Sequence, residues 1–241
     1  IHCVAGVSAG AIVASAFASG ATPAEIAAAG RAMKFTDVAR WSVNRMGLAG
    51  SDRMTAFLRK LLKQFRFEDM RMPLGVLATD LASGDPALFH TRGDVSVAVR
   101  ASCSYPGLFQ PVKHEGRLLV DGAMSMEIPA ELCRSLGATH VVSVNLPMQG
   151  EQAAPGNMLE VVNRCFQIMQ AQREHEWRQA SDLVLSPEVR SMQWDAFSSA
   201  DQLLEAGRQA ARSALPAITE WLKPESACSV RLGALCVEAA V

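Results

Sequence analysis

The sequence predicts an α/β protein, specifically a three-layer sandwich with a largely parallel central sheet. Short apolar, β-favouring segments alternate with longer segments of helical periodicity along the chain. The 241 residues, 49% of them hydrophobic, are enough to bury a substantial core in one domain. Charged residues make up 20%, and the formal net charge is −1. This balance gives no indication of a nucleic-acid partner.

The chain begins with a predicted strand followed by two predicted helices. Residues 1–4 are mostly apolar and β-favouring, which is typical of the end of a buried strand. A run of small residues at 9–18 predicts a helix that ends at Gly20, a residue suited to a left-handed C-terminal position. The tetrapeptide TPAE at 22–25 is a capping box with proline at the first helical position, and it predicts a second helix through about Met33.

The rest of the chain continues the alternation. Glu115-Gly116 is expected to form the turn of a hairpin, and the strand at 141–146 is expected to be buried. The expected strands lie at residues 73–81, 87–90, 110–114, 117–120, 141–146 and 183–185. Further helices are expected from Ser51 or Asp52 through Leu62, and at about 94–103, 129–136, 158–180 and 199–214.

A nucleophile-elbow motif lies near the start of the chain. Residues 6–10 read GVSAG and fit the pattern G-x-S-x-G, with Ser8 between the expected strand and helix. Gly6 and Gly10 leave room for strained backbone angles that bulkier neighbours would forbid. The Ser8 hydroxyl would then lie at a helix N-terminus, where N–H groups near Ala9 favour developing negative charge. The alternative is a glycine-serine turn that only caps a helix.

A serine hydroxyl is a weak nucleophile and needs a neighbouring base. Asp121 is the stronger candidate, because it ends a predicted strand directly before Gly122, where open α/β sheets place their ligand sites. A carboxylate acts as a base near neutral pH only if burial raises its pKa, so this interpretation predicts a partly desolvated Asp121. The alternative is that Asp121 only starts a turn, as Asp-Gly pairs often do.

The five histidines fit poorly with the usual chain order of serine, acid and then histidine. His175 lies in a charged helical segment, and His140 begins a predicted strand. A serine hydrolase with a histidine base remains a rival mechanism, and it requires His175 or His140 for activity.

Several ordered sequence blocks resemble the patatin-like phospholipase family. The blocks are GVSAGAIV at 6–13, ATDL at 78–81, RASCSYPG at 100–107 and LVDGA at 119–123. The similarity runs to about Leu222 and includes WDAF at 194–197 and AGR at 206–208. The branch that the chain resembles is the bacterial one, which is related to the neuropathy target esterase catalytic domain.

The resemblance implies a Ser–Asp dyad. Ser8 attacks an ester carbonyl, and Asp121, in the DGA motif with Gly122 and Ala123, takes its proton. Water activated by Asp121 then releases the fatty acid from an acyl-enzyme. The implied substrate is a fatty-acyl ester of a lipid, either a phospholipid, a lysophospholipid or an acylglycerol, and peripheral contact with a membrane is compatible with it. The head group, the acyl length and the oligomeric state stay open.

The glycine-rich loop that supplies the family's oxyanion hole follows a strand upstream of the serine, and this sequence lacks both. We therefore expect residues 1–223 to be a patatin-like catalytic domain without its N-terminal strand and oxyanion loop, followed by a tail at 224–241 of unassigned role. Since losing one oxyanion donor lowers kcat by about 10²–10³, we expect the chain to be nearly inactive until it is extended upstream. A non-catalytic regulatory or scaffold protein is the alternative.

The sequence contains no metal or nucleotide signature, so we expect hydrolysis without a cofactor. The six cysteines form no C-x-x-C pair and favour a reduced, cytoplasmic setting, in which most of them serve as small core residues. No apolar run is long enough to span a bilayer. Because the chain opens at Ile1, almost inside a strand, a targeting segment cannot be read from it.

Overall fold

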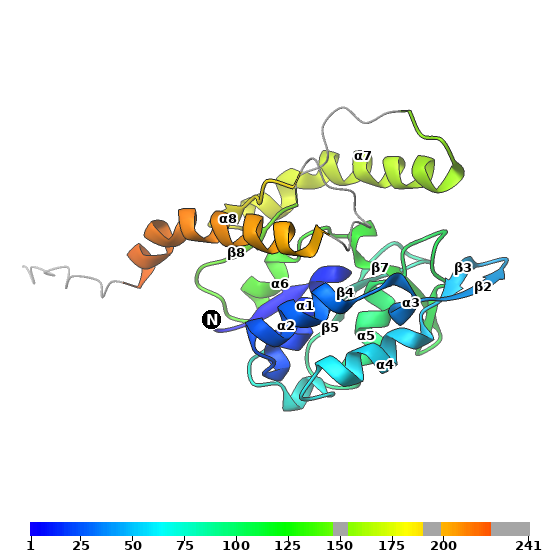
Figure 1. The fold of residues 1–241 in the computed structure, drawn as a ribbon, viewed down its shortest axis with the longest axis horizontal. Coiled ribbons are helices and arrows are strands. Elements are labelled where there is room, and N and C mark those ends of the chain that lie inside the picture. The colour runs from blue at the N-terminus through cyan, green and yellow to red at the C-terminus, as the bar shows by residue number, and fades with distance from the viewer. Residues whose placement is uncertain (147–153, 190–198, 223–241) are drawn as a thin grey trace, which may run out of the picture.

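The structure is a computed structural model that describes residues 1–146, 154–189 and 199–222 (Figure 1). The WDAF segment at 194–197 and the tail at 224–241, which the sequence analysis singled out, lie outside the described residues. Within the described ranges, no helix is both long enough and apolar enough to cross a membrane.

The central sheet is mixed. Its strands are β1 (Val4–Gly6), β4 (Leu74–Asp80), β5 (Pro86–Phe89), β6 (Val112–His114) and β7 (Arg117–Asp121). Strand β1 runs parallel to β4, whereas β5 and β7 are antiparallel to β4, and β6 is antiparallel to β7. The expectation of a largely parallel sheet was therefore wrong. Short turns join β4 to β5 and β6 to β7, and a short turn can connect only antiparallel neighbours.

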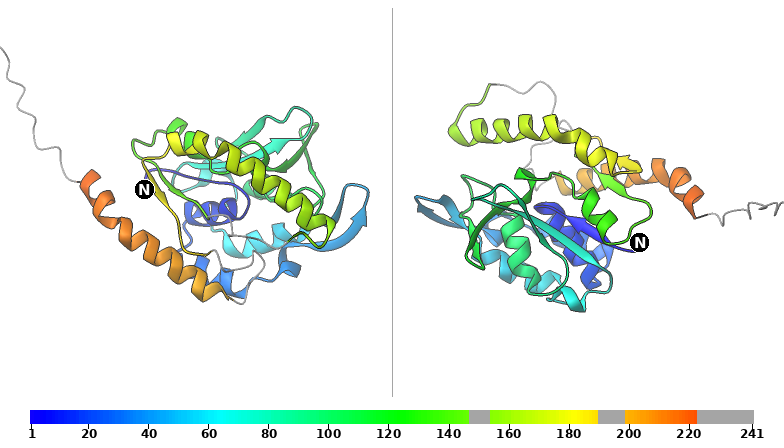
Figure 2. Two further views of the ribbon diagram at one scale, coloured as in Figure 1. Left: turned by 90° about the horizontal axis from the view of Figure 1, so that it is seen from above. Right: turned by 180° about the vertical axis from the view of Figure 1, so that it is seen from behind.

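Helices lie on both faces of this sheet (Figures 1 and 2). On one face, α1 (Ala9–Ser19), α4 (Asp52–Leu61) and α5 (Val95–Ser102) share the main core with Leu74 and Val76 of β4. On the other face, α6 (Ala130–Ser135) places Leu132 against Gly75, where an added Cβ would lie 2.6 Å from Leu132 Cδ2. Helix α7 (Met158–Gln179) packs against α6 and against the 3-10 turn η2 (Gly122–Met124).

The helix ends follow the local signals in the sequence. Helix α1 ends at Gly20, whose φ is 97°. Helix α2 (Pro23–Ala32) begins with the predicted capping box, in which Thr22 and Glu25 each accept a hydrogen bond from the other's backbone N–H. Each partner therefore satisfies an N–H group that the first helical turn would leave unpaired.

The predicted strand at 141–146 is shorter and less buried than expected. Strand β8 (Val142–Val144) pairs in parallel with β9 (Leu183–Leu185) in a separate two-stranded sheet. Val142 and Val144 are 40% and 55% exposed, whereas Ser143 between them is buried. The expectation of a buried strand was wrong because alternation along β8 turns Ser143 inward and the two valines outward.

Three further parts complete the described chain. Helix α8 (Ala200–Trp221) runs past the predicted end near 214, through Pro216, and Trp221 at its end stacks on the ring of His140. The hairpin of β2 (Arg40–Asn44) and β3 (Gly47–Gly50) projects from one end of the molecule (Figure 1). The short helices α3 (Phe35–Val38) and η1 (Phe67–Asp69) lie in connections between these elements.

Candidate functional site

The ends of two strands meet beside the middle of β4. Strand β1 ends with Gly6 opposite Val76, and β7 ends with Asp121 opposite Ala78. Because β1 is parallel and β7 antiparallel to β4, the two strands run toward each other and end two residues apart along β4, about 7 Å. The sequence argument placed Asp121 at the shared carboxyl edge of parallel strands. Its nearness to the serine elbow comes instead from this head-on arrangement.

Ser8 occupies the strained elbow that the motif predicts. Its φ is 53° and its ψ is −124°, a conformation that residues with a side chain rarely adopt. A Cβ added to Gly6 would lie only 2.3 Å from the backbone oxygen of Gly10, so the first and last residues of the motif are in direct backbone contact. Glycine at position 6 is therefore required by this close approach.

A buried serine from a distant segment holds the elbow. The backbone N–H of Ser8 donates a 2.8 Å hydrogen bond to Oγ of Ser102, which is fully buried at the end of α5. Backbone N–H groups at the start of a helix have no acceptor within the helix, and this hydrogen bond supplies one for the Ser8 N–H. The N–H groups of Ala9 and Gly10, in the first turn of α1, belong to the end of the helix that favours negative charge.

Asp121 is almost completely buried, with 1% of its surface exposed. Burial raises the pKa of Asp121 to about 6, although the N–H of Ala123, which donates to Oδ1 at 3.0 Å, and the nearby Ser8 hydroxyl both lower it. Oδ2 is buried and accepts no hydrogen bond of normal length and angle in the described structure. The Ser8 hydroxyl is thus close enough to affect the carboxylate, while Oδ2 keeps its lone pairs free.

A second set of buried polar groups fixes the backbone around Asp121. The Thr79 hydroxyl lies 2.9 Å from the carbonyl oxygen of Asp121 and 2.8 Å from the Ser125 hydroxyl. The N–H of Asp121 donates to the carbonyl oxygen of Ser104 at 3.0 Å. A Cβ added to Gly122 would lie 2.2 Å from the Leu77 carbonyl oxygen, which explains glycine after the aspartate. These contacts leave the carboxylate little freedom to move.

Cys103 and Tyr105 also lie close to Ser8 or Asp121. Burial and the Asp121 charge raise the pKa of Cys103, whose thiol also lies close to Ser8. Burial and the same charge raise the pKa of Tyr105 to about 12. Both groups therefore stay protonated at neutral pH. Among the described cysteines, Cys3 and Cys103 are buried as expected for core residues, Cys133 is half-buried, and Cys165 on α7 is exposed.

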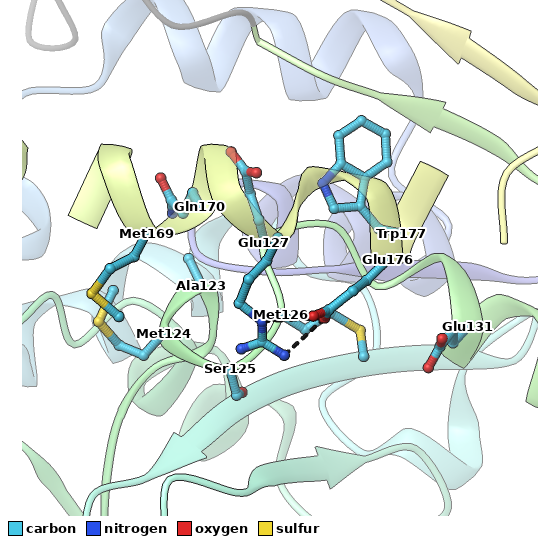
Figure 3. A pocket seen from close by; sticks show the side chains of 11 residues that line it. Ala123, Met124, Ser125, Met126, Glu127, Glu131, Met169, Gln170, Glu176 and Trp177 are labelled. Atoms are coloured by element: carbon cyan, nitrogen blue, oxygen red, sulfur yellow. Dashed lines mark hydrogen bonds and ion pairs between the residues drawn. The ribbon is translucent and has the colours of Figure 1, made fainter. Parts of the chain in front are cut away.

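A pocket lies between η2 and α7, directly beyond the Asp121 turn (Figure 3). Met124 of η2 and Met169 of α7 point toward each other on one side of it. Glu127 is half-buried there, and burial raises its pKa. Ala123, whose N–H contacts the Asp121 carboxylate, also lines the pocket. The structure places Met124 and Met126 in the wall of this pocket.

The structure brings Ser8, Asp121, Gly6, Gly10 and Ala123 together, but it does not add a histidine. His140 stacks on Trp221, and His175 is exposed on α7. Within the described ranges, no three His, Cys, Asp or Glu side chains are grouped to hold a metal ion. Ser102, Thr79 and Ser125 were not singled out by sequence reasoning. The available signal was their polar character inside or beside otherwise apolar blocks.

A serine on a strained strand-to-helix elbow in an α/β fold is the arrangement found in hydrolases with a nucleophilic serine. Residues 1–134 match the patatin-like phospholipase family. This match covers more than half of the chain, and the chain belongs to that family.

Curated relatives include bacterial members of the NTE family, which confirms the resemblance to that branch. An uncharacterized NTE family protein of Mycobacterium tuberculosis is 28% identical over 239 residues, covering 88% of this chain and 41% of that protein. One of Mycobacterium bovis is 29% identical over 119 residues, covering 49% and 32%. Patatin-like phospholipase domain-containing protein 7 of Mus musculus is 30% identical over 96 residues, covering 39% and 7%. The chain thus spans about two fifths of the first relative's length.

Proposed function

We propose that this chain carries a lipid acyl hydrolase site in which Ser8 is the nucleophile and Asp121 is the general base. One observation carries the proposal: a strained serine elbow lies beside a buried carboxylate whose pKa is raised to about 6. A base of this pKa is largely ionised at neutral pH, yet it is basic enough to accept a proton during the reaction. Membership of the patatin-like phospholipase family supports a lipid ester as the substrate class.

The proposed reaction has two halves. In the first, Ser8 Oγ attacks the ester carbonyl while its proton moves to Asp121, and the alcohol leaves after taking that proton. In the second, Asp121 takes a proton from water, which attacks the acyl carbonyl. The bond to Ser8 Oγ then breaks, the fatty acid leaves, and Asp121 returns the proton to Ser8 Oγ. Because Oδ1 is held by the Ala123 N–H, the free Oδ2 is the atom proposed to carry the proton.

The developing oxyanion requires donors that are aimed before the reaction begins. The Ser8 N–H is already committed to Ser102, so the first-turn N–H groups of Ala9 and Gly10 are the donors proposed at the elbow. The expectation that an upstream glycine-rich loop supplies further donors stays a prediction. The division into a catalytic domain at 1–223 and a separate tail likewise remains a proposal.

The pocket beside the Asp121 turn supports an acyl chain as the group bound there. Met124, Met126 and Met169 give it a flexible apolar wall, and methionine side chains adapt to aliphatic chains of different shape. Polar residues such as Glu127 also line the pocket, and the head group stays open.

Fluorophosphonate labelling followed by peptide mapping tests the proposed nucleophile. We expect the label on Ser8, and we expect its loss in Ser8→Ala and in Asp121→Asn, because the asparagine amide cannot accept the proton. His140→Ala and His175→Ala are the matched controls for the rival histidine mechanism and should label normally. The experiment is performed on this chain and on a version extended upstream, since the glycine-rich loop is expected there.

The outcomes separate the candidate functions. Labelling of Ser8 that depends on Asp121 supports the dyad. A folded, extended chain that stays unlabelled would falsify the hydrolase and favour a non-catalytic scaffold of the same fold. Loss of labelling in either histidine variant would instead favour a triad.

A further inference from the structure

One end of the molecule displays apolar side chains that the protein does not bury. Trp41 and Met46, on the β2–β3 hairpin, are 61% and 49% exposed. Met158 and Val161, at the start of α7, are also exposed. The hairpin and the start of α7 project at the same end of the molecule in both the front view and the view from above (Figures 1 and 2). We call the end of the molecule that carries these four residues the interfacial end.

The interfacial end is continuous with the proposed site. The hairpin is held by the loop after α5, since Ala49 N–H donates to the Leu108 carbonyl at 2.9 Å and Gln110 N–H donates to Ala49 at 3.0 Å. Within the same loop, Tyr105 packs edge-on against Phe166 of α7 and donates its hydroxyl to Asn163. Tyr105 also lies close enough to Asp121 to sense its charge. The loop therefore contacts the hairpin, α7 and the backbone of Asp121.

The hairpin end is positively charged, unlike the chain as a whole. Residues 34–53 contain four basic and two acidic side chains, a net charge of +2, whereas the whole chain has a net charge of −1. Arg45 is exposed at the hairpin turn, and no ion pair is recorded for it in the described structure. Arg40 lies 3.7 Å from Asp52, whose other oxygen accepts a hydrogen bond from Arg100, so this acid is shared between two arginines.

We propose that the interfacial end docks onto an anionic lipid surface and brings lipid from that surface to the Ser8–Asp121 site. The inference rests on the proposed function for its choice of a lipid partner. Tryptophan is favoured at the boundary between lipid and water because its ring is apolar and its N–H is polar. Basic residues next to it are attracted to anionic head groups. The exposed apolar side chains beside the positively charged hairpin are therefore complementary to a negatively charged bilayer.

Vesicle flotation with the full chain tests the docking. The vesicles contain ether-linked phosphatidylcholine, either alone or mixed with ether-linked phosphatidylglycerol, so that the lipids offer no carboxylic ester bond for hydrolysis. We expect stronger binding to the mixed vesicles, and we expect added salt to weaken it. Arg45→Glu should reduce the affinity for mixed vesicles by about tenfold or more, because the reversal removes one attraction and adds one repulsion. The double variant Trp41→Ser, Met46→Ser should weaken binding to both kinds of vesicle.

Matched variants control for charge and apolar area elsewhere. Arg92→Glu reverses an exposed arginine outside the hairpin, and Leu215→Ser with Leu222→Ser removes two exposed apolar side chains, one on α8 and one directly after it. All variants should keep the wild-type unfolding temperature. Wild-type binding in the hairpin variants overturns the proposal, as does a wild-type chain that binds neither vesicle. If a hairpin variant leaves vesicle binding unchanged but changes the molecular mass measured by light scattering, this end contacts a second copy of the chain instead.

The test is independent of catalysis. Vesicle binding without ester hydrolysis by any version of the chain would overturn the proposed function and leave the docking intact. Hydrolysis of a short, soluble ester by a chain that does not bind vesicles would overturn the docking and leave the proposed function intact.

Discussion

Two residues other than glycine adopt a positive φ in the described part of the chain, and they do so for different reasons. Glu115, with φ 47°, precedes Gly116, with φ 80°, in the turn of the β6–β7 hairpin. Two successive positive φ values are what a tight two-residue hairpin requires, so sequence neighbours explain Glu115. Ser8 does not lie in a hairpin turn that would require a positive φ. Its backbone is held by Gly6, Gly10 and a serine 94 residues away.

The backbone strain at Glu115 and the strain at Ser8 call for different interpretations. Strain that a turn type requires carries no information about function, because the turn alone accounts for it. Strain that needs contacts from separate segments, as at Ser8, indicates that the position itself is what the fold preserves.

Gly6→Ala should have the largest effect. Its new Cβ would meet backbone atoms of Gly10 and Ala11 at 2.3 to 2.6 Å, and these atoms cannot move without displacing α1. We expect the free energy of unfolding to fall by more than about 3 kcal/mol. In Gly10→Ala, the new Cβ meets no atom within 4 Å, so this control should remain within about 1 kcal/mol of wild type. Chemical denaturation measures both, and equal losses would contradict the close-approach explanation.

Asp121 should make stability depend on pH. Its pKa is about 6 in the folded state, above the ordinary aspartate value of 3.8, so the folded state binds more protons between these values. Its contribution to stability therefore falls as pH rises from about 4 to 6 and is constant above. Relative to Asp121→Asn, the wild type should lose roughly 3 kcal/mol over that range. Thermal unfolding of both proteins from pH 4 to pH 8 measures the difference, and parallel curves would show that the carboxyl does not titrate this way.

Ser102→Ala should loosen the elbow without touching substrate. The Ser8 N–H would lose its acceptor, which costs about 1–3 kcal/mol. We expect the rate of fluorophosphonate labelling to fall about tenfold to a hundredfold, because the misplaced Ser8 reacts more slowly. Ser104→Ala is the control, since its hydroxyl contacts only the Arg100 carbonyl in the recorded bonds. A positioning role also predicts a change in kcat with little change in KM, whereas two variants that label equally would exclude it.

Glu115→Asn should have the smallest effect. Asparagine tolerates a positive φ better than glutamate, so we expect a gain of about 0.5–1 kcal/mol in the free energy of unfolding. The Glu115 contacts with His114 and Arg117, at 3.9 and 4.0 Å, are exposed and contribute little. Activity should not change. A loss of activity in this variant would mean that the two strained positions are not as different as the contacts indicate.

Features set by neighbouring residues could be predicted from the sequence. Gly20 ends α1, Asp94 caps α5, and Glu115-Gly116 turns the β6–β7 hairpin, since each depends on atoms only a few residues apart. Ser8 and Asp121 were recognised in the same way, from the glycines that surround them.

Features set by distant contacts could not be predicted. The direction of β7 relative to β4 depends on which strands become neighbours, and that choice is made by the whole sheet. Ser102 looks like any buried helical serine until the fold brings the Ser8 N–H to its oxygen. Likewise, Val142 and Val144 of β8 are exposed because the rest of the protein leaves that face of the strand uncovered.

The buried thiol of Cys103 makes the site selective toward different classes of electrophile. A raised pKa keeps this sulfur as a neutral thiol beside Ser8, so soft alkylating reagents such as iodoacetamide find no thiolate to attack there. Under the proposed mechanism, hard phosphorus electrophiles react with the serine oxygen instead. Cys165 on α7 is exposed and therefore open to the soft reagents. The proposed site thus predicts that one molecule can take a phosphonate on Ser8 and a thiol-linked fluorophore on Cys165, each attached by its own chemistry.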